Sequence, residues 1–232
     1  MPARKIPLVT GEHYHIISRA TAGAPVFSEV ADARTFVDCL KYYSQINPSF
    51  KFSYFHKNPN PEDTKYDKLL VTIESYCIMP THIHFLLKQN EDDGISMYMQ
   101  RLLVSFSHYF NKKHRRIGQV LISPFKSVHI ETEEQFMHVS RYIHLNPSSA
   151  GIVEDPLDYP YSSLYQYKSG QASGPVDPTF VLGCFSSKES YLRFVYSRKD
   201  YQRKLQYIKT SLLDYDDPGS SLDYSDPGSE IL

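Results

Sequence analysis

The chain is organised around one segment, Tyr76-Cys77-Ile78-Met79-Pro80-Thr81-His82-Ile83-His84-Phe85-Leu86-Leu87. Its β-branched and aromatic residues predict two neighbouring strands, separated by a break at Pro80 and paired as an antiparallel hairpin. Successive side chains of a strand point to opposite faces, so His82 and His84 project together while Ile83 packs behind them. Two imidazoles about 7 Å apart on one face can hold one metal cation.

A second His-x-His triplet occurs at His13 and His15, and such triplets arise by chance in a chain of 232 residues with ten histidines. Taken alone, either triplet is best interpreted as two hydrogen-bonded histidines in a half-buried strand. Further motifs are therefore needed before His82 and His84 indicate a metal site.

Apolar spacing and turn residues predict the remaining elements. The expected strands are 13–19, 50–55, 69–79, the histidine strand and 128–130, and the expected helices are 29–46, a long one opening at Gly94, 133–145 and 186–210. This order predicts an α+β ferredoxin-like sandwich, with one antiparallel sheet, helices packed on one of its faces, and the His-x-His triplet on a central strand.

Composition places the chain among ordinary globular proteins. Its 232 residues, 41% hydrophobic and 22% charged, predict one domain with appendages. It has no apolar run of about 18 residues and no signal-peptide core at its start, so no membrane partner is expected. Three scattered cysteines form no spaced pair, which favours a reducing, cytoplasmic location.

The net charge of −1 conceals two regions of opposite sign. Between Gly94 and Ile130 there are six basic residues and no acid: Arg101, Lys112, Lys113, Arg115, Arg116 and Lys126. Such a run predicts a surface that contacts nucleic-acid phosphates, and a solvated helix face is the alternative. From Leu212 onward there are six acids and no base. This predicts an acidic tail at 212–232 that is either disordered or a mobile anionic strip that competes with DNA for the basic surface.

One later segment, Ser140-Arg141-Tyr142-Ile143-His144-Leu145-Asn146-Pro147, resembles the tyrosine motif of the HUH-type single-strand DNA transposases, and more closely that of the REP-associated, IS200-like branch. Further matches stand in the family's order at Tyr14–Arg19, Ile117–Gln119, Pro124–Ser127 and Asp158–Ser163. The resemblance covers roughly residues 10–168 and implies the same ferredoxin-like fold. Where the family has a Val-Arg pair after Asn-Pro, this chain has Ser148-Ser149 and lacks that cation.

The resemblance implies a metal-dependent, single-stranded DNA transposase that nicks and rejoins strands through a covalent 5′-phosphotyrosine. Its partner would be single-stranded or hairpin DNA. Tyr142 would be the nucleophile, and His82, His84 and Asn146 would bind Mg²⁺ or Mn²⁺. The resemblance also implies a catalytic domain at residues 1–170. It fades after Gly170, where a linker and a helical pattern predict a C-terminal helical extension at 171–211.

Helix geometry places Tyr142 and Asn146 one turn apart on the same flank, beside a buried stripe. Pro147 is expected to end the helix at Asn146, because a residue before proline avoids the α region. A phenol with a pKa near 10 needs the metal, a base or a cation to become a nucleophile. His138, one turn before Tyr142, is a candidate for that role.

Two other functions remain open. One is a non-catalytic or domesticated protein that binds nucleic-acid hairpins on the same fold. The other is a zinc-stabilised module built from Cys77, His82 and His84. The sequence also leaves open whether the active site forms within one chain or between the two chains of a homodimer.

Overall fold

The computed structural model describes residues 7–48, 52–53, 68–172 and 176–200, and every structural statement below concerns these residues. Four strands form one antiparallel sheet: β1 (His13–Arg19), β2 (Val71–Met79), β3 (His82–Gln89) and β4 (Lys126–Ile130). The helices are α1 (Val30–Tyr43), α3 (Gly94–His114), α4 (Glu133–Ser149), α5 (Leu164–Ser169), α6 (Thr179–Gly183) and α7 (Lys188–Tyr196), with short 3-10 turns at Thr21–Gly23 and Pro156–Asp158.

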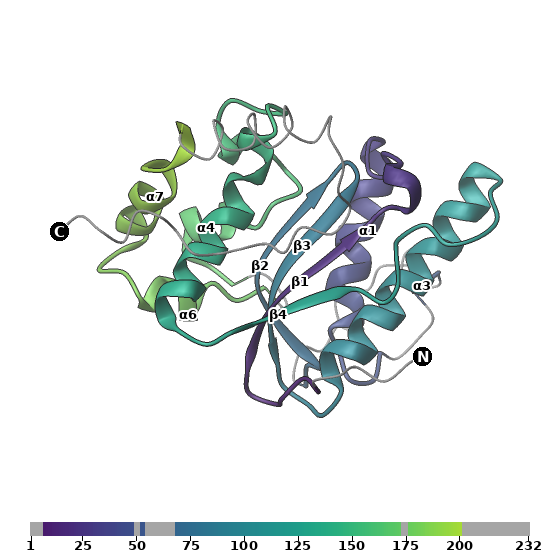
Figure 1. The fold of residues 1–232 in the computed structure, drawn as a ribbon, viewed down its shortest axis with the longest axis horizontal. Coiled ribbons are helices and arrows are strands. Elements are labelled where there is room, and N and C mark those ends of the chain that lie inside the picture. Colours follow the sequence, from purple (N-terminus) through teal and green to yellow (C-terminus); the bar gives the residue numbers. More distant parts are fainter. Residues whose placement is uncertain (1–6, 49–51, 54–67, 173–175, 201–232) are drawn as a thin grey trace, which may run out of the picture.

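The sheet order and its connections give the predicted ferredoxin-like fold. The order is β2-β3-β1-β4, and each neighbouring pair is antiparallel. α1 joins β1 to β2 and α3 joins β3 to β4, so each helix links two strands that have a third strand between them. The prediction of an α+β antiparallel sheet with the His-x-His triplet on a central strand is confirmed, because β3 lies inside the sheet (Figure 1).

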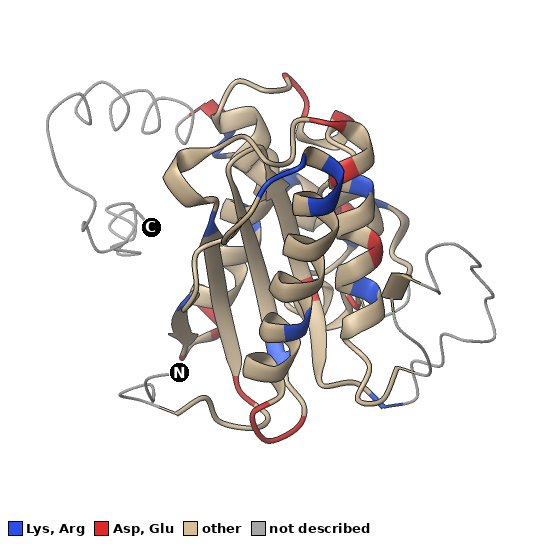
Figure 2. Cartoon of the chain, turned by 90° about the vertical axis from the view of Figure 1, so that its right-hand side faces the viewer, with Lys and Arg blue, Asp and Glu red and all other residues tan. Residues whose placement is uncertain are grey.

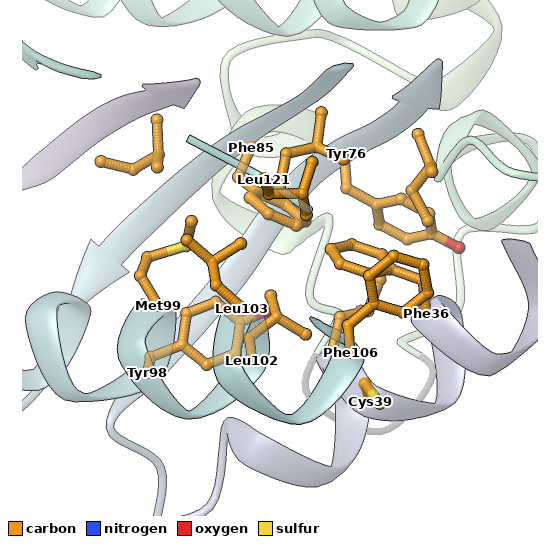
Figure 3. Close-up of a cluster of buried hydrophobic side chains, with 14 of the residues drawn as sticks. Phe36, Cys39, Tyr76, Phe85, Tyr98, Met99, Leu102, Leu103, Phe106 and Leu121 are labelled. Carbon is orange, nitrogen blue, oxygen red and sulfur yellow. The ribbon is translucent and has the colours of Figure 1, made fainter. Parts of the chain in front are cut away.

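Helices cover both faces of the sheet, so the prediction that they pack on one face is wrong for α4 (Figure 1). α1 and α3 cover the face that carries Phe85, where Phe36 and Phe106 join the buried cluster (Figure 3). α4 covers the other face, where Phe136 lies in one cluster with Leu86 of β3. The physical reason is that β2 and β3 carry apolar side chains on both faces, and each face needs a cover.

Several predicted boundaries differ from the structure. β4 begins at Lys126, two residues before the predicted start, and α7 covers the first part of the helix predicted at 186–210. Within the strand predicted at 50–55, residues 52–53 are described and they are helical. The predicted acidic tail lies outside the described residues. No helix in the described part of the chain is both long and apolar enough to cross a membrane.

α4 continues through Pro147, so the prediction that it ends at Asn146 is wrong. Its end is closed by two backbone bonds: the Ile152 amide donates to the Pro147 carbonyl, and the Gly151 amide donates to the Ser148 carbonyl. Gly151 has a φ of 70°, the left-handed conformation that such a cap requires. Because this cap satisfies the last carbonyls, it outweighs the preference of the residue before proline for extended backbone.

α6 and α7 share one hydrophobic core with α4. Buried His144 of α4 contacts two other segments of the chain. Its Nδ1 lies 2.6 Å from Oη of Tyr191 on α7, and its Nε2 lies 2.8 Å from Oγ of Ser163, just before α5. The Arg141 guanidinium stacks over the Phe194 ring of α7 at 4.3 Å. α7 therefore packs on α4 from the side away from the sheet (Figure 1).

We expect Tyr191→Phe to lower the free energy of unfolding by about 1–3 kcal/mol, because a ring nitrogen of His144 would lose its partner inside the core. Urea denaturation would measure this change. Tyr165→Phe is the matched control, since Tyr165 on α5 has 67% of its surface exposed. Equal stability of the two variants would show that the bond between Tyr191 and His144 contributes nothing.

Candidate active site

Three histidines and one tyrosine meet on the α4 face of the sheet. The ring centroids of His82 and His84 on β3 lie 4.9 Å apart, and Tyr142 of α4 stands edge-on to His84 at 5.5 Å. His15 of β1 lies beside them, 5.2 Å from His84 and 6.1 Å from Tyr142. The structure thus brings together three of the residues singled out by the sequence and adds His15, which the sequence pattern left as part of a chance triplet.

Hydrogen bonds occupy one ring nitrogen of each histidine on β3. Nδ1 of His84 lies 3.0 Å from Nε2 of His15, and Nδ1 of His82 lies 3.0 Å from Oγ1 of Thr81. Within the described residues neither Nε2 atom of the β3 histidines has a hydrogen-bond partner. Metal-binding histidines commonly use their second nitrogen to bond a neighbouring polar group. Both side chains are therefore arranged to offer Nε2 to a cation.

Burial keeps the three histidines neutral at physiological pH. It lowers the pKa of His15 to about 3 and, with help from the charge of Arg19, the pKa of His82 to about 4. Burial also lowers the pKa of His84 well below its usual range, and the neighbouring histidines and Arg19 add to this effect. A neutral imidazole is the form that binds metal, so the site needs no proton release at neutral pH.

Tyr142 is half-buried, and burial raises the pKa of its hydroxyl. A side-chain hydrogen bond with Asn146 and the charge of Arg19 both lower this pKa and so offset part of the rise. Asn146 Nδ2 donates to the Tyr142 carbonyl at 3.2 Å, which leaves Oδ1 of the amide for other partners. The hydroxyl is thus protonated at neutral pH, and additional positive charge is needed to make it a nucleophile.

Arg19 is a cation of the site that sequence analysis missed. It ends β1, its Cα pairs with that of His82 across the sheet, and its side chain is exposed. Arg19 lies within the motif Tyr14–Arg19. A strand pattern does not give the register between two strands, so it could not show that Arg19 faces His82. The proposed helper His138 instead packs against Phe194, 5.7 Å between centroids.

The six predicted DNA-binding cations fall into two groups. Lys113 Nζ lies 2.7 Å from Glu29 and 2.6 Å from Asp32, both from the start of α1, and Arg101 donates to the carbonyls of Gln45 and Ile46. Figure 2 shows the acidic positions of α1 beside the basic end of α3. The other four cations are exposed: Lys112, Arg115, Arg116 and Lys126. The segment from Gly94 to Ile130 contains no acid, but in the folded chain Glu29 and Asp32 lie beside its Lys113.

Asp32 is buried at the centre of this ion-pair group. Burial raises the pKa of its carboxyl, but hydrogen bonds from Lys113, His114 and Tyr109 outweigh burial and lower it. Ligand atoms of Glu29, Asp32 and His114 lie within 4.8 Å of one another, yet Lys113 already supplies the counter-charge there.

Elsewhere among the described residues no three His, Cys, Asp or Glu side chains meet that spacing, which leaves the zinc module at Cys77 without support.

Comparison with known proteins points to the same family as the motifs. Residues 63–146, which include β2, β3 and most of α4, match the family model described as "Transposase IS200 like". A protein of Haemophilus influenzae that carries the provisional name REP-associated tyrosine transposase is 32% identical over 101 aligned positions. The alignment covers 39% of this chain and 57% of that protein, so the chain spans little more than half of its relative.

A solved structure of a REP-associated tyrosine transposase bound to a REP hairpin has a similar fold. The TM-score is 0.52 at 15% sequence identity, and the match covers 81% of this chain and 96% of that chain. At this identity the likeness concerns the fold alone. Together with the sequence matches, it confirms the resemblance to the REP-associated, IS200-like transposases.

Proposed function

We propose that this chain cuts and rejoins single-stranded DNA, with Tyr142 as the nucleophile and hairpin-forming DNA as the substrate. The observation that carries the proposal is the contact between Tyr142 and His84 within one chain, at 5.5 Å between ring centroids. The names of the similar proteins support it, since one carries the provisional name REP-associated tyrosine transposase and another is described as a REP-associated tyrosine transposase bound to a REP hairpin.

The proposed reaction exchanges one phosphoester bond for another. The Tyr142 oxygen forms a bond to a DNA phosphorus while the bond from that phosphorus to the 3′-oxygen breaks, which leaves a 5′-phosphotyrosine. The phenolic proton passes to solvent and the departing 3′-oxygen takes up a proton, so charge is balanced. A DNA 3′-hydroxyl later attacks the phosphotyrosine, which restores Tyr142 and rejoins a strand.

The side chains around Tyr142 fit a divalent cation. His82 Nε2, His84 Nε2 and Asn146 Oδ1 would hold it, and these two neutral imidazoles and one amide bring no negative charge. By their softness these ligands suit Mn²⁺, Ni²⁺ or Zn²⁺. We propose Mg²⁺ or Mn²⁺, as the resemblance implies, because phosphate oxygens and water would fill the remaining positions. When bound, the cation supplies positive charge to the phosphate and to the departing oxygen. Arg19 adds a second positive charge from the end of β1.

The direct test is an incubation of the full chain with single-stranded oligonucleotides that each form a hairpin with randomised flanks. In the presence of Mg²⁺ or Mn²⁺ we expect a protein–DNA adduct that survives denaturation, and we expect no adduct with EDTA. Fully duplexed DNA of the same sequences is the control. Tight hairpin binding without an adduct would instead favour the non-catalytic hairpin-binding protein.

The four exposed cations should set the salt dependence of DNA binding. Replacing Lys112, Arg115, Arg116 and Lys126 with glutamine should flatten the plot of log affinity against log salt, by about 0.7 for each phosphate of a single strand that is no longer neutralised. Binding should weaken alike for all sequences, because cations at the phosphates position DNA without reading bases. A fluorescence-anisotropy titration at several salt concentrations would measure both effects.

Lys168→Gln on α5 is the matched control, because Lys168 is exposed and lies outside the basic run. Its slope should equal that of the wild-type chain. An unchanged slope in the quadruple variant would show that DNA follows another surface of the molecule.

A further inference from the structure

We infer that His15 is a positioning residue of the proposed metal site, which accepts the Nδ1 proton of His84 and so keeps the His84 Nε2 lone pair available to a cation. This inference rests on the proposed function. It concerns a side chain that contributes no ligand atom to the proposed set and comes from a strand other than the one that carries the two histidine ligands.

The contact between His15 and His84 is close and sealed from water. His15 is 0% exposed and His84 is 3% exposed. Nε2 of His15 lies 3.0 Å from Nδ1 of His84, and the two rings stack with centroids 5.2 Å apart at an angle of 23°. A polar group buried to this extent needs a hydrogen-bond partner, so each ring nitrogen in this contact depends on the other.

A neutral imidazole carries one N–H, so this contact allows two arrangements. If His84 donates from Nδ1, its Nε2 has a free lone pair and can bind a cation. If His15 donates from Nε2, then His84 must carry its proton on Nε2 and cannot bind one there. A cation at the site therefore selects the first arrangement, in which His15 is protonated on Nδ1 and accepts at Nε2.

Two substitutions separate this role from simple packing. His15→Gln places an amide oxygen near the former Nε2 and can still accept the His84 proton, whereas His15→Leu has a similar volume and no acceptor. His13→Gln is the matched control, because His13 lies on the same strand and face but pairs with Glu74 at 2.8 Å. Free Mn²⁺ measured by electron paramagnetic resonance would give the metal affinity of each folded protein without any reaction.

We expect His15→Leu to weaken Mn²⁺ binding about 10- to 100-fold, the usual effect of losing the partner of a metal-binding histidine. His15→Gln should keep most of the affinity, and His13→Gln should keep all of it. Wild-type affinity in His15→Leu would overturn the inference and leave the proposed function intact. An equal loss in both His15 variants would overturn it too, because shape rather than the acceptor would then matter.

A second measurement covers the case in which His15→Leu does not fold. Long-range proton–nitrogen spectra of the wild-type chain with saturating Mg²⁺ report which ring nitrogen of each histidine carries the proton. We expect both His15 and His84 to be protonated on Nδ1. An Nε2 proton on His84 in a chain that still forms the DNA adduct would overturn the inference alone. A wild-type chain that binds no metal would overturn the proposed metal site with it.

Discussion

Replacing Tyr142 with phenylalanine is expected to abolish the covalent protein–DNA adduct and all strand cleavage, while hairpin binding stays nearly unchanged. The substitution removes a single oxygen, and that oxygen is the atom that forms the proposed bond to phosphorus. The ring can keep its edge-on contact with His84, and removal of the hydrogen bond with Asn146 should cost about 1 kcal/mol of stability.

The measurement is denaturing electrophoresis of the protein after incubation with a labelled hairpin oligonucleotide, followed by mapping of the modified peptide. Tyr161→Phe is the matched control, since Tyr161 is partly buried and packs near the end of β2. It should form the adduct at the wild-type rate. An adduct in Tyr142→Phe, or a modified peptide from another of the nineteen tyrosines, would refute the assignment.

Local geometry explains why much of the site could be predicted from sequence. The shared face of His82 and His84 follows from strand alternation, and the proximity of Tyr142 to Asn146 follows from one helical turn. The central place of β3 follows from the order of strands and helices in a ferredoxin-like chain. Each of these features can be predicted once the type of each element and its order along the chain are known.

The missed features depend on register between distant segments. His15 meets His84 across 69 residues of sequence, and Lys113 meets Asp32 across 81, so no local pattern contains either pair. The predicted end of α4 at Asn146 is wrong for a different reason. The residue before a proline prefers extended backbone, but the glycine cap at Gly151 decides where this helix ends.

Removing either histidine of β3 should eliminate metal-dependent cleavage without unfolding the chain. His82→Ala and His84→Ala each delete one of two imidazole ligands, and the remaining donors carry no charge that could hold Mg²⁺ by attraction. The two variants should differ in stability. His84→Ala should cost about 1–3 kcal/mol because it leaves buried His15 without this partner. His82 is partly exposed, and among the described residues its side chain hydrogen-bonds Thr81, so its loss should cost less.

Adduct formation at increasing Mn²⁺, together with urea denaturation with and without EDTA, would measure both effects. His129→Ala is the matched control, because His129 lies exposed on β4 and bonds Glu12, and it should cleave as wild type. The chelated wild-type chain should be inactive and as stable as before, since both hydrophobic clusters are complete without a metal ligand. Unfolding on chelation would instead indicate a structural zinc ion. Cleavage that survives in both histidine variants would place the metal, if one is needed at all, away from β3.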